Sequence, residues 1–358
     1  MVKKPERRAA VVNRGKSDRK WKLLLLILLA FFSAGCSGQG EKPKDERFYE
    51  DDVTSEKEEY IVVGFAQIGS ESDYRIANSA SFRETFCEEN GYYLLFEDGQ
   101  QKQENQIKAL RNFILQEVDY IVLDPVVETG WDEVLQEAKA AGIPVILSDR
   151  SVTVEDEGLY TCWVGSDFEE EGRKAGRWLE DYLKSEGREE EEIRLVTLQG
   201  TLGSSAQIGR MNGFAEVLRL HDRWNMLEYA SGDFTQSKGQ EVMARFLDTY
   251  PDIDVVISEN DNMTFGAIEA IEEAGKTCGP KGEIIMISFD AVSEASFTAM
   301  KEGKLHADVE CNPFLAPKVD EIIGRLERGE TVEKIQYVEE QCFDAFMDLD
   351  AIMEQRKY

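Results

Sequence analysis

The chain has 358 residues, of which 42% are hydrophobic and 10% aromatic, and these values exclude a largely disordered protein. The formal net charge is −30, and setting aside the arm before Leu23, which carries nine basic and two acidic residues, leaves −37. Such a field repels nucleic acid and anionic lipid, and a neutral or cationic small ligand is compatible with it. Solubility at a cell surface is the alternative explanation, and charge alone does not decide between the two.

The beginning of the chain has the pattern of a secretory signal. A basic arm is followed by an apolar stretch from Leu23 to Phe32, which is too short to remain as a membrane span. Small residues then lead to Cys36. The pattern predicts a signal peptide over residues 1–36 and a flexible, polar and charged linker over residues 37–59.

The segment Ser33-Ala34-Gly35-Cys36 resembles a bacterial lipobox. In signals of that family the cysteine is acylated and becomes the first residue of the mature protein. The resemblance therefore implies a lipid anchor, with palmitate among its acyl chains, at Cys36. It implies a location at the extracytoplasmic face of the cell membrane or in the periplasm. An ordinary signal peptide with an incidental cysteine is the alternative.

From residue 60 onwards, short apolar runs alternate with helix-like stretches. The runs expected to form strands cover residues 60–66, 92–96, 120–123, 144–147, 161–164, 194–198, 255–258 and 284–289. Stretches expected to form helices include residues 101–116, 131–141, 170–184, 205–220, 237–250 and 263–274. This alternation predicts an α/β fold of parallel sheets with helices on both faces. About ten strands are too many for one such unit, so we expect two similar lobes.

The cysteines and histidines give little support to a metal site or to nucleophilic catalysis. Beyond Cys36 the cysteines are irregularly spaced, at Cys87, Cys162, Cys278, Cys311 and Cys342. This spacing argues against a disulfide framework and leaves a single bridge open. The two histidines, His221 and His306, stand in unrelated contexts, so we expect no metal and no cofactor.

Polar side chains recur where the expected strands end, and in doubly wound sheets these positions meet the ligand. The candidate site residues are Glu71, Tyr74, Arg75, Asp149, Arg150, Arg210, Asn260 and Asp290. Planar carboxylate, amide and guanidinium groups form paired hydrogen bonds that match neighbouring sugar hydroxyls. An aromatic ring such as that of Tyr74 covers the apolar face of a sugar ring. The pattern predicts a carbohydrate pocket between two lobes.

Each candidate also has a purely structural explanation. Asp149 and Arg150 can pair with each other at the surface. Asn260 and Asp261 can be the N-cap of the helix that follows, and Arg210 can be one more charge on a helix face. The recurrence of such groups at the same topological place favours the pocket.

Several stretches give the chain a family resemblance. They are residues 63–72, 98–107, 125–131, 143–150, 231–239, 260–263 and 288–290. Through them the chain resembles the type I periplasmic sugar-binding proteins, the solute receptors of ABC importers, from about Tyr60 to its end. Within that family it is most similar to the galactofuranose-binding branch, through Gly69-Ser70-Glu71-Ser72 and the run from Gln100 to Gln106.

The resemblance implies two Rossmann-like lobes that are joined by a three-strand hinge and close on a sugar. The N-terminal lobe would comprise residues 60–163 with 312–337, and the C-terminal lobe residues 164–311 with 338–358. It implies that sugar oxygens are bound by Asp149, Arg150, Arg210, Asn260 and Asp290, with further contacts from Glu71 and Arg75. Tyr74 stands where the branch usually has tryptophan, so its stacking role is expected and the exact sugar stays open.

The leading hypothesis is an extracytoplasmic solute-binding lipoprotein that captures a monosaccharide and delivers it to an ABC permease, as a monomer and without catalysis. A sugar-sensing receptor that feeds a sensor kinase or chemoreceptor is the alternative. A glycosidase would use a carboxyl pair such as Glu71 and Asp149. A repressor of related fold is ruled out because a signal segment stands where a basic helix-turn-helix domain should precede Tyr60.

Overall fold

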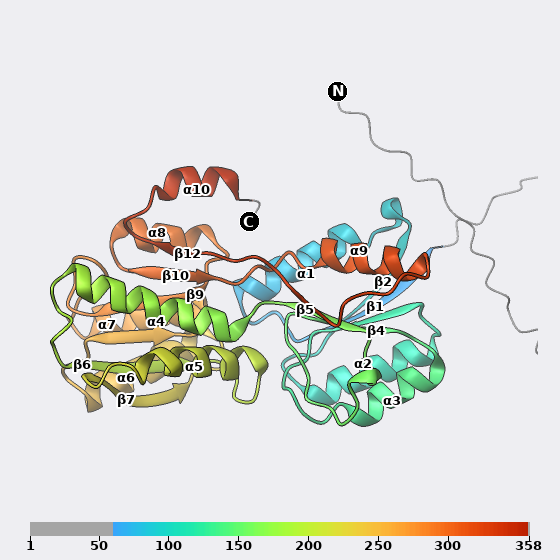
Figure 1. Cartoon of the computed structure of the whole chain (residues 1–358), viewed down its shortest axis with the longest axis horizontal. Helices are drawn as coiled ribbons and strands as arrows, with labels where there is room; N and C mark the ends of the chain where they lie inside the picture. The colour runs from blue at the N-terminus through green and yellow to red at the C-terminus, as the bar shows by residue number, and fades with distance from the viewer. Residues whose placement is uncertain (1–59, 357–358) are drawn as a thin grey trace, which may run out of the picture. The chain divides into compact units, whose positions relative to one another are not determined.

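The computed structural model describes residues 60–356, and two six-stranded sheets with flanking helices form its framework (Figure 1). The first sheet has the strand order β11-β5-β4-β3-β1-β2, and the second has the order β12-β10-β9-β8-β6-β7. Neighbouring strands run parallel except β12, which pairs antiparallel with β10. The expected α/β fold with two parallel-dominated sheets is confirmed. The predicted signal peptide, linker and Cys36 lie outside the described residues.

The strands of the first sheet are β1 (Ile61–Gln67), β2 (Tyr92–Asp98), β3 (Tyr120–Leu123), β4 (Val145–Ser148), β5 (Cys162–Gly165) and β11 (Ile335–Tyr337). Those of the second sheet are β6 (Ile193–Gln199), β7 (Trp224–Ser231), β8 (Val255–Ser258), β9 (Ile285–Asp290), β10 (Ala307–Glu310) and β12 (Cys342–Asp344). The central strands β3, β4, β8 and β9 are buried along their whole length. Helices on both faces explain why these strands read as continuous apolar runs rather than alternating ones.

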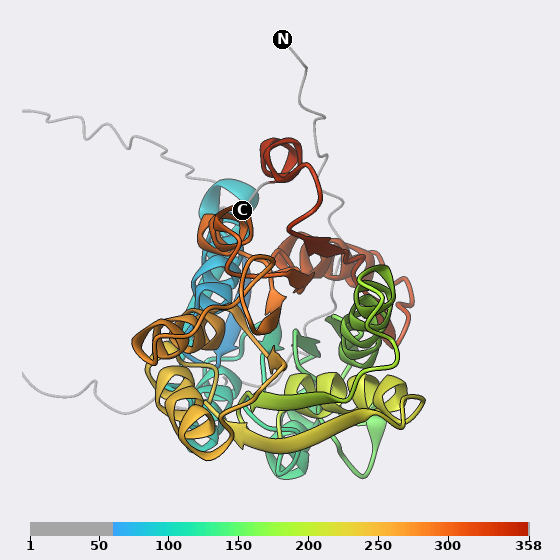
Figure 2. The same ribbon diagram turned by 90° about the vertical axis from the view of Figure 1, so that its left-hand side faces the viewer.

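The helices beside the first sheet are α1 (Asp73–Thr85), α2 (Gln103–Leu115), α3 (Asp132–Ala141) and α9 (Ala316–Glu327). Those beside the second sheet are α4 (Phe168–Ser185), α5 (Ser205–Leu218), α6 (Gln236–Thr249), α7 (Asp261–Glu273), α8 (Glu294–Glu302) and α10 (Leu349–Gln355). In the first lobe, α2 and α3 lie on one side of the sheet and α1 and α9 on the other (Figure 1). Figure 2, in which the second lobe faces the viewer, shows helices on both sides of its sheet as well.

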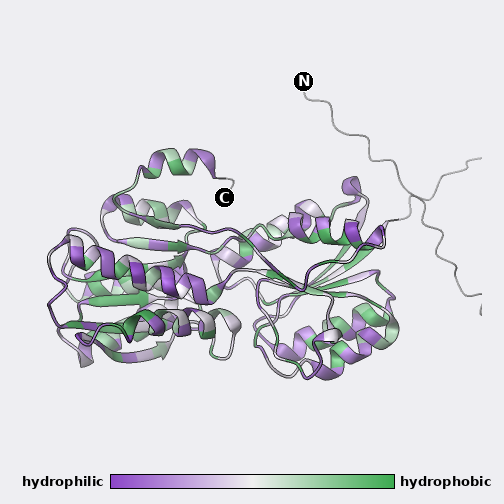
Figure 3. Cartoon of the chain, viewed as in Figure 1, coloured by the Kyte–Doolittle hydropathy of each residue, from purple (hydrophilic) through white to green (hydrophobic). Residues whose placement is uncertain are grey.

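Apolar residues gather in the strands and on the helix faces that cover them, while the outer helix faces are polar (Figure 3). In the first lobe, for example, Phe65 of β1 stacks on Phe82 of α1 with ring centroids 4.0 Å apart. Val319 and Ile323 of α9 belong to the same buried cluster. Within residues 60–356, no helix combines the length and the apolar character that a membrane crossing requires. The five cysteines in this range are free thiols, so the single bridge left open is not formed among them.

The chain passes between the two sheets three times. The first crossover, at residues 166–167, leads from β5 to α4, the second, at residues 311–315, leads from β10 to α9, and the third, at residues 338–341, leads from β11 to β12. Both sheets therefore contain strands from separate parts of the chain. This strand membership supports the expected lobe limits, which stay a prediction.

Candidate ligand-binding site

A cavity lies between the two lobes, where strands of both sheets end. It is lined by Glu71, Ser72, Tyr74, Arg75, Asp149, Arg150, Phe168, Ala206, Arg210, Phe234, Asn260, Asp290 and Cys311. All eight candidate site residues are in this lining, so the fold brings them together.

Arg75, in the first turn of α1, is buried among three carboxyl groups. Its Nη1 lies 2.5 Å from Asp124 Oδ2, its Nη2 lies 2.8 Å from Asp149 Oδ2, and its Nε lies 3.4 Å from Glu71 Oε1. Burial disfavours the charge of the guanidinium, but Asp124 and Asp149 outweigh burial and raise the pKa of Arg75 well above its usual value. The side chain is therefore a fixed cation.

Asp149 follows β4 in a left-handed backbone conformation, with φ at 59°, which a residue other than glycine rarely adopts. Its Oδ1 accepts a hydrogen bond of 2.9 Å from the Tyr74 hydroxyl. Burial alone would raise the pKa of Asp149, but Arg75 and Arg150 overcome this and lower it, so the group is ionised at neutral pH. Burial raises the pKa of Tyr74, which keeps its hydroxyl a donor.

Arg150 is buried beside these groups with spare hydrogen-bonding capacity. Its Nη1 donates to the Val126 carbonyl at 3.0 Å, whereas its Nε is 3.9 Å from Asp149 Oδ2 and has no hydrogen-bond partner among the described residues. Across the cleft its guanidinium lies 5.1 Å from the ring centroid of Phe234. A surface pair of Asp149 and Arg150 is therefore wrong, because the two are only 1% and 2% exposed.

Arg210 of α5 takes the corresponding position in the second lobe. Its Nε donates to Glu171 Oε2 at 2.6 Å, and its Nη2 lies 3.1 Å from Asp290 Oδ1. Its Nη1 donates to the main-chain oxygen of Glu259. The guanidinium also packs against the ring of Phe289. At 3% exposure it is not a charge on an outer helix face, so that explanation is wrong.

Asp290, at the end of β9, completes this half of the lining. Its φ of 105° is again a conformation that favours glycine, and burial raises the pKa of its carboxyl group well above the usual value. In each lobe, a carboxyl group on a strained backbone after a strand therefore holds an arginine. Such strain persists only where the surroundings impose it, and it is typical of binding sites.

Asn260 has both of the roles that the sequence suggested for it. Its Oδ1 accepts from the Met263 amide at 2.9 Å, which makes it the N-cap of α7. Its Nδ2 donates to the Phe234 carbonyl at 3.2 Å, and the same side chain lines the cavity. The cap holds the amide group at the cavity wall.

Five lining residues are not among the sequence candidates: Ser72, Phe168, Ala206, Phe234 and Cys311. Phe168 and Phe234 add rings from the second lobe, where the sequence analysis expected only Tyr74. Asp124, which fixes Arg75, directly follows β3, and the strand-end rule applied there would have found it. Glu171 is a helix residue that only the folded chain brings to Arg210.

The two lobes contact each other around the cavity. The Asp73 amide donates to Asn262 Oδ1 at 3.0 Å, and the Ser151 amide donates to Ser205 Oγ at 3.0 Å. A main-chain bond of 3.0 Å joins Glu128 to Gly203. Because each bond links a residue of the first lobe to one of the second, the structure is in a closed conformation.

Comparison with known proteins agrees with this architecture. Residues 63–316 match the family described as the periplasmic binding protein domain. The galactofuranose-binding protein YtfQ of Escherichia coli is 42% identical over 279 residues, covering 77% of this chain and 85% of the relative. A Mycobacterium smegmatis structure in complex with β-D-fucofuranose is 42% identical, with a TM-score of 0.78, covering 83% of this chain and 95% of that one.

A third similar protein is the periplasmic binding protein component of the arabinose ABC transporter from Shewanella sp. ANA-3, bound to α- and β-L-arabinofuranose. It is 40% identical, with a TM-score of 0.76, and the match covers 83% of this chain and 95% of that one. The resemblance seen in the sequence is confirmed. The family match spans most of the described lobes and the relatives align over nearly their full length, so the chain belongs to the periplasmic binding protein family.

Proposed function

We propose that the protein is an extracytoplasmic receptor that captures a monosaccharide by closing its two lobes and delivers it to an ABC permease. The observation that supports this most is the pair of buried arginines, Arg75 and Arg210, which come from opposite lobes and face one cavity. A ligand that touches both lobes stabilises the closed form, because only there are both sets of contacts made.

The charge balance of the lining favours an uncharged ligand. Three carboxyl groups (Glu71, Asp149 and Asp290) and three guanidinium groups (Arg75, Arg150 and Arg210) line the cavity. Each of these carboxyl groups lies within 3.4 Å of an arginine, so an added carboxylate or ammonium group would compete with an existing ion pair. Sugar hydroxyls, which both donate and accept, suit such a lining. The three similar proteins are named for, or hold, furanose sugars, so we infer a five-membered-ring monosaccharide.

Individual roles follow from the contacts of each residue. Arg150, with its unpartnered Nε, is the proposed donor to a sugar oxygen from the first lobe, and Asp149, Asn260 and Asp290 are proposed acceptors or donors to hydroxyls. Glu71 and Arg75 add contacts from the loop after β1. Tyr74, Phe168 and Phe234 supply rings that cover apolar parts of the sugar.

We infer that no bond of the sugar is made or broken. A glycosidase needs one carboxyl group whose raised pKa keeps it protonated as the acid. Asp149 has a lowered pKa, and both Asp149 and Glu71 lie within ion-pair distance of Arg75. These contacts argue against Glu71 and Asp149 as the acid and nucleophile pair of a glycosidase.

Calorimetry with a panel of sugars in furanose and pyranose forms tests the proposal. We expect a dissociation constant well below 1 mM, which corresponds to more than about 4 kcal/mol, for at least one furanose. Arg150→Met should weaken binding at least about 100-fold, since it removes a buried charged donor. Arg111→Gln, at an exposed position of α2, is the matched control and should bind normally. Absence of sub-millimolar binding to every sugar would refute the proposed function.

The lipid anchor is a separate proposal and rests on the sequence around Cys36. In a bacterial host, Cys36→Ser should release the protein from the membrane fraction and abolish incorporation of labelled palmitate. Cys87→Ser, in the described part of the chain, should change neither property. A Cys36→Ser protein that still incorporates palmitate would contradict the anchor.

A further inference from the structure

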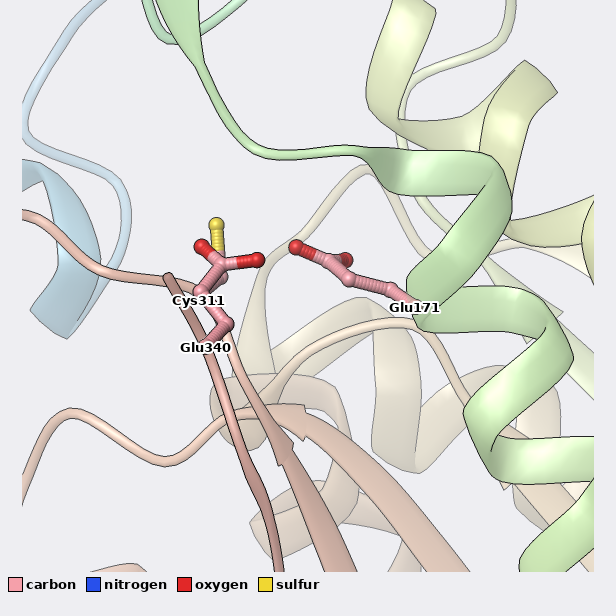
Figure 4. A group of neighbouring side chains, drawn as sticks. All are labelled: Glu171, Cys311 and Glu340. Carbon is pink, nitrogen blue, oxygen red and sulfur yellow. The ribbon is translucent and has the colours of Figure 1, made fainter. Parts of the chain in front are cut away.

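A second cluster of titratable side chains, outside the sugar cavity's candidate residues, includes a carboxyl group that contacts Arg210. It consists of Glu171 of α4, Cys311 of the second crossover and Glu340 of the third, whose carboxylate and thiol atoms lie within 4.8 Å of one another (Figure 4). Ser166, of the first crossover, donates to Glu340 Oε1 at 2.5 Å. The cluster thus joins all three crossovers to α4, whose Glu171 accepts a hydrogen bond from Arg210.

The two carboxyl groups of this cluster face each other. Figure 4 shows the carboxyl group of Glu171 directed toward that of Glu340. Glu171 is fully buried: its Oε2 accepts from Arg210, whereas its Oε1 has no hydrogen-bond partner among the described residues. Glu340 Oε1 accepts from Ser166 and also from the Asn312 amide at 2.8 Å. The unpartnered oxygen of Glu171 therefore requires a positive charge or a donor from the direction of Glu340.

The charges around Glu171 and Glu340 favour the binding of one proton by these two carboxyl groups. Arg210 is shared between Glu171 and Asp290, and Lys174 Nζ donates to the main-chain oxygen of Glu340 at 2.8 Å. Asp149, across the cleft, adds a negative charge that acts on Glu171. Glu171 and Glu340 therefore approach each other with Arg210, which is shared with Asp290, and Lys174 as the neighbouring cations. Two carboxylates this close do not both stay ionised, and one proton between them removes the repulsion.

We propose that Glu171 and Glu340 share one proton in the closed form, and that this pair is a positioning device for Arg210. The inference rests on the proposed function, because Arg210 faces the cavity proposed there for the sugar. The proton lets Glu340 donate to the free oxygen of Glu171 while the other oxygen keeps its bond to the guanidinium. When the lobes open, the crossovers change conformation, water reaches the two groups, and the proton is released.

The proposal fixes the sign of a pH effect on sugar binding. Burial, and then the charge of Glu171, raises the pKa of Glu340 to about 9 in this closed structure. Hydration in the open form returns that pKa toward its ordinary value of about 4.3. Closure therefore takes up a proton between these two pH values. Affinity should be constant at low pH, fall by at most about tenfold per pH unit between them, and level off above about pH 9.

Calorimetry of the tightest sugar from pH 5 to 9, in buffers of different ionisation enthalpy, measures both the affinity and the proton uptake. The wild type should weaken with rising pH and take up close to one proton. Glu340→Gln keeps a donor toward Glu171 and should lose about one proton of uptake together with the corresponding part of the pH slope. Glu339→Gln, at the neighbouring exposed position, should behave as the wild type. An unchanged pH slope in Glu340→Gln would overturn the shared proton.

Two measurements separate this inference from the proposed function. The infrared difference spectrum between sugar-bound and sugar-free protein at pH 7 should contain a protonated-carboxyl band that grows on binding in the wild type and not in Glu340→Gln. Sugar binding without that band overturns the shared proton and leaves the proposed function standing, whereas the absence of any sugar binding refutes the proposed function itself. Equilibrium dialysis against Zn²⁺ tests whether a metal ion, rather than a proton, binds between Glu171, Cys311 and Glu340. Stoichiometric binding that Cys311→Ser abolishes would overturn the proton in favour of a metal.

Discussion

Each of the two central arginines is held by carboxyl groups from more than one segment of the chain. Arg75 lies between Asp124 and Asp149, and Arg210 lies between Glu171 and Asp290. Because each guanidinium is already fixed by several partners within the protein, little side-chain freedom is left to lose when a ligand arrives. Removing one partner leaves a buried charge uncompensated, which typically costs about 3–5 kcal/mol.

Removal of the Tyr74 hydroxyl tests whether its hydrogen bond to Asp149 contributes to sugar binding. Tyr74→Phe removes the donor to Asp149, whose bond is 2.9 Å long, and keeps the ring. A hydrogen bond to a charged group contributes about 1.5–3 kcal/mol, so calorimetry should show sugar affinity at least about tenfold weaker. Tyr250→Phe, which removes a hydroxyl bonded to Glu228 on the second lobe, should bind as the wild type. Equal affinity in Tyr74→Phe would mean that the hydroxyl does not orient Asp149.

For single residues, the sequence predicts most of the side chains that line the cavity, but it does not predict the side chains that hold them in place. Asp149 and Asp290 follow strands, so their place at the cavity follows from the topology of parallel sheets. Glu171 supports Arg210 from 39 positions away in another helix, and no local pattern distinguishes it from other helix glutamates. Phe234 follows β7, an edge strand with a mixed burial pattern that the apolar-run rule does not detect.

Among the elements, the pair of α4 and α5 brings Glu171 to Arg210 through an unusually close approach. A Cβ atom added to Gly172 would lie 2.2 Å from the main-chain oxygen of Arg210, and one added to Gly213 would lie 1.9 Å from that of Glu169. Only glycine fits such contacts, so the packing of these helices fixes the site.

Gly172→Ala should therefore force the two helices apart. Overpacking of this kind typically costs about 1–3 kcal/mol of unfolding free energy, and sugar affinity should fall with it because Arg210 moves. Chemical denaturation and calorimetry measure the two effects. Gly324→Ala in α9 is the matched control: its added Cβ would meet no atom closer than 3.5 Å, so it should stabilise by up to about 1 kcal/mol. A neutral Gly172→Ala would contradict the close packing.

A second buried acid pair makes the stability of the second lobe depend on pH. Asp261 of α7 and Asp308 of β10 are fully buried, and burial raises both pKa values, that of Asp308 to about 7. The folded state thus binds a proton that the unfolded state releases above about pH 4. Stability is complete below that pH and falls by at most about 1.4 kcal/mol per unit until about pH 7.

Asp308→Asn should remove most of this dependence, since an amide keeps a donor toward Asp261 and has no proton to lose. Chemical denaturation at pH values from 4 to 8 measures how the free energy of unfolding depends on pH. The exposed Asp248→Asn should retain the wild-type slope. A wild-type stability that rises between pH 4 and 7 would show that the pair is ionised when folded.

The elements themselves were predictable where one face is apolar. The helix expected over residues 131–141 is α3, at Asp132–Ala141, and the run 255–258 is β8. α1 was not expected, because its buried face is largely polar, with Arg75, Asn78 and Ser79. β12 has only three residues and pairs antiparallel at an edge, a placement that the alternation of strand and helix does not imply.

For the whole molecule, the balance between open and closed forms depends on a few bonds across the cleft. Asn262→Ala removes the acceptor of the Asp73 amide. Because this bond forms only on closure, sugar affinity should fall about 2- to 10-fold, equivalent to about 0.5–1.5 kcal/mol, with unchanged unfolding of the lobes. Asn225→Ala, at an exposed position of β7, is the control.

Small-angle scattering of Asn262→Ala should show a larger radius of gyration than the wild type at partial saturation, and the same radius at full saturation. An affinity within experimental error of the wild type would mean that closure does not depend on this contact.

The late return of the chain to the first sheet also governs the order of assembly. β11, the edge strand beside β5, and α9, which covers Phe65 and Phe82, are made after nearly all of the second lobe. A polypeptide that emerges amino-terminus first therefore cannot complete its first domain until about residue 337 has been synthesised. Such a delay leaves the first domain incomplete while most of the second is already made, so the two domains finish folding together.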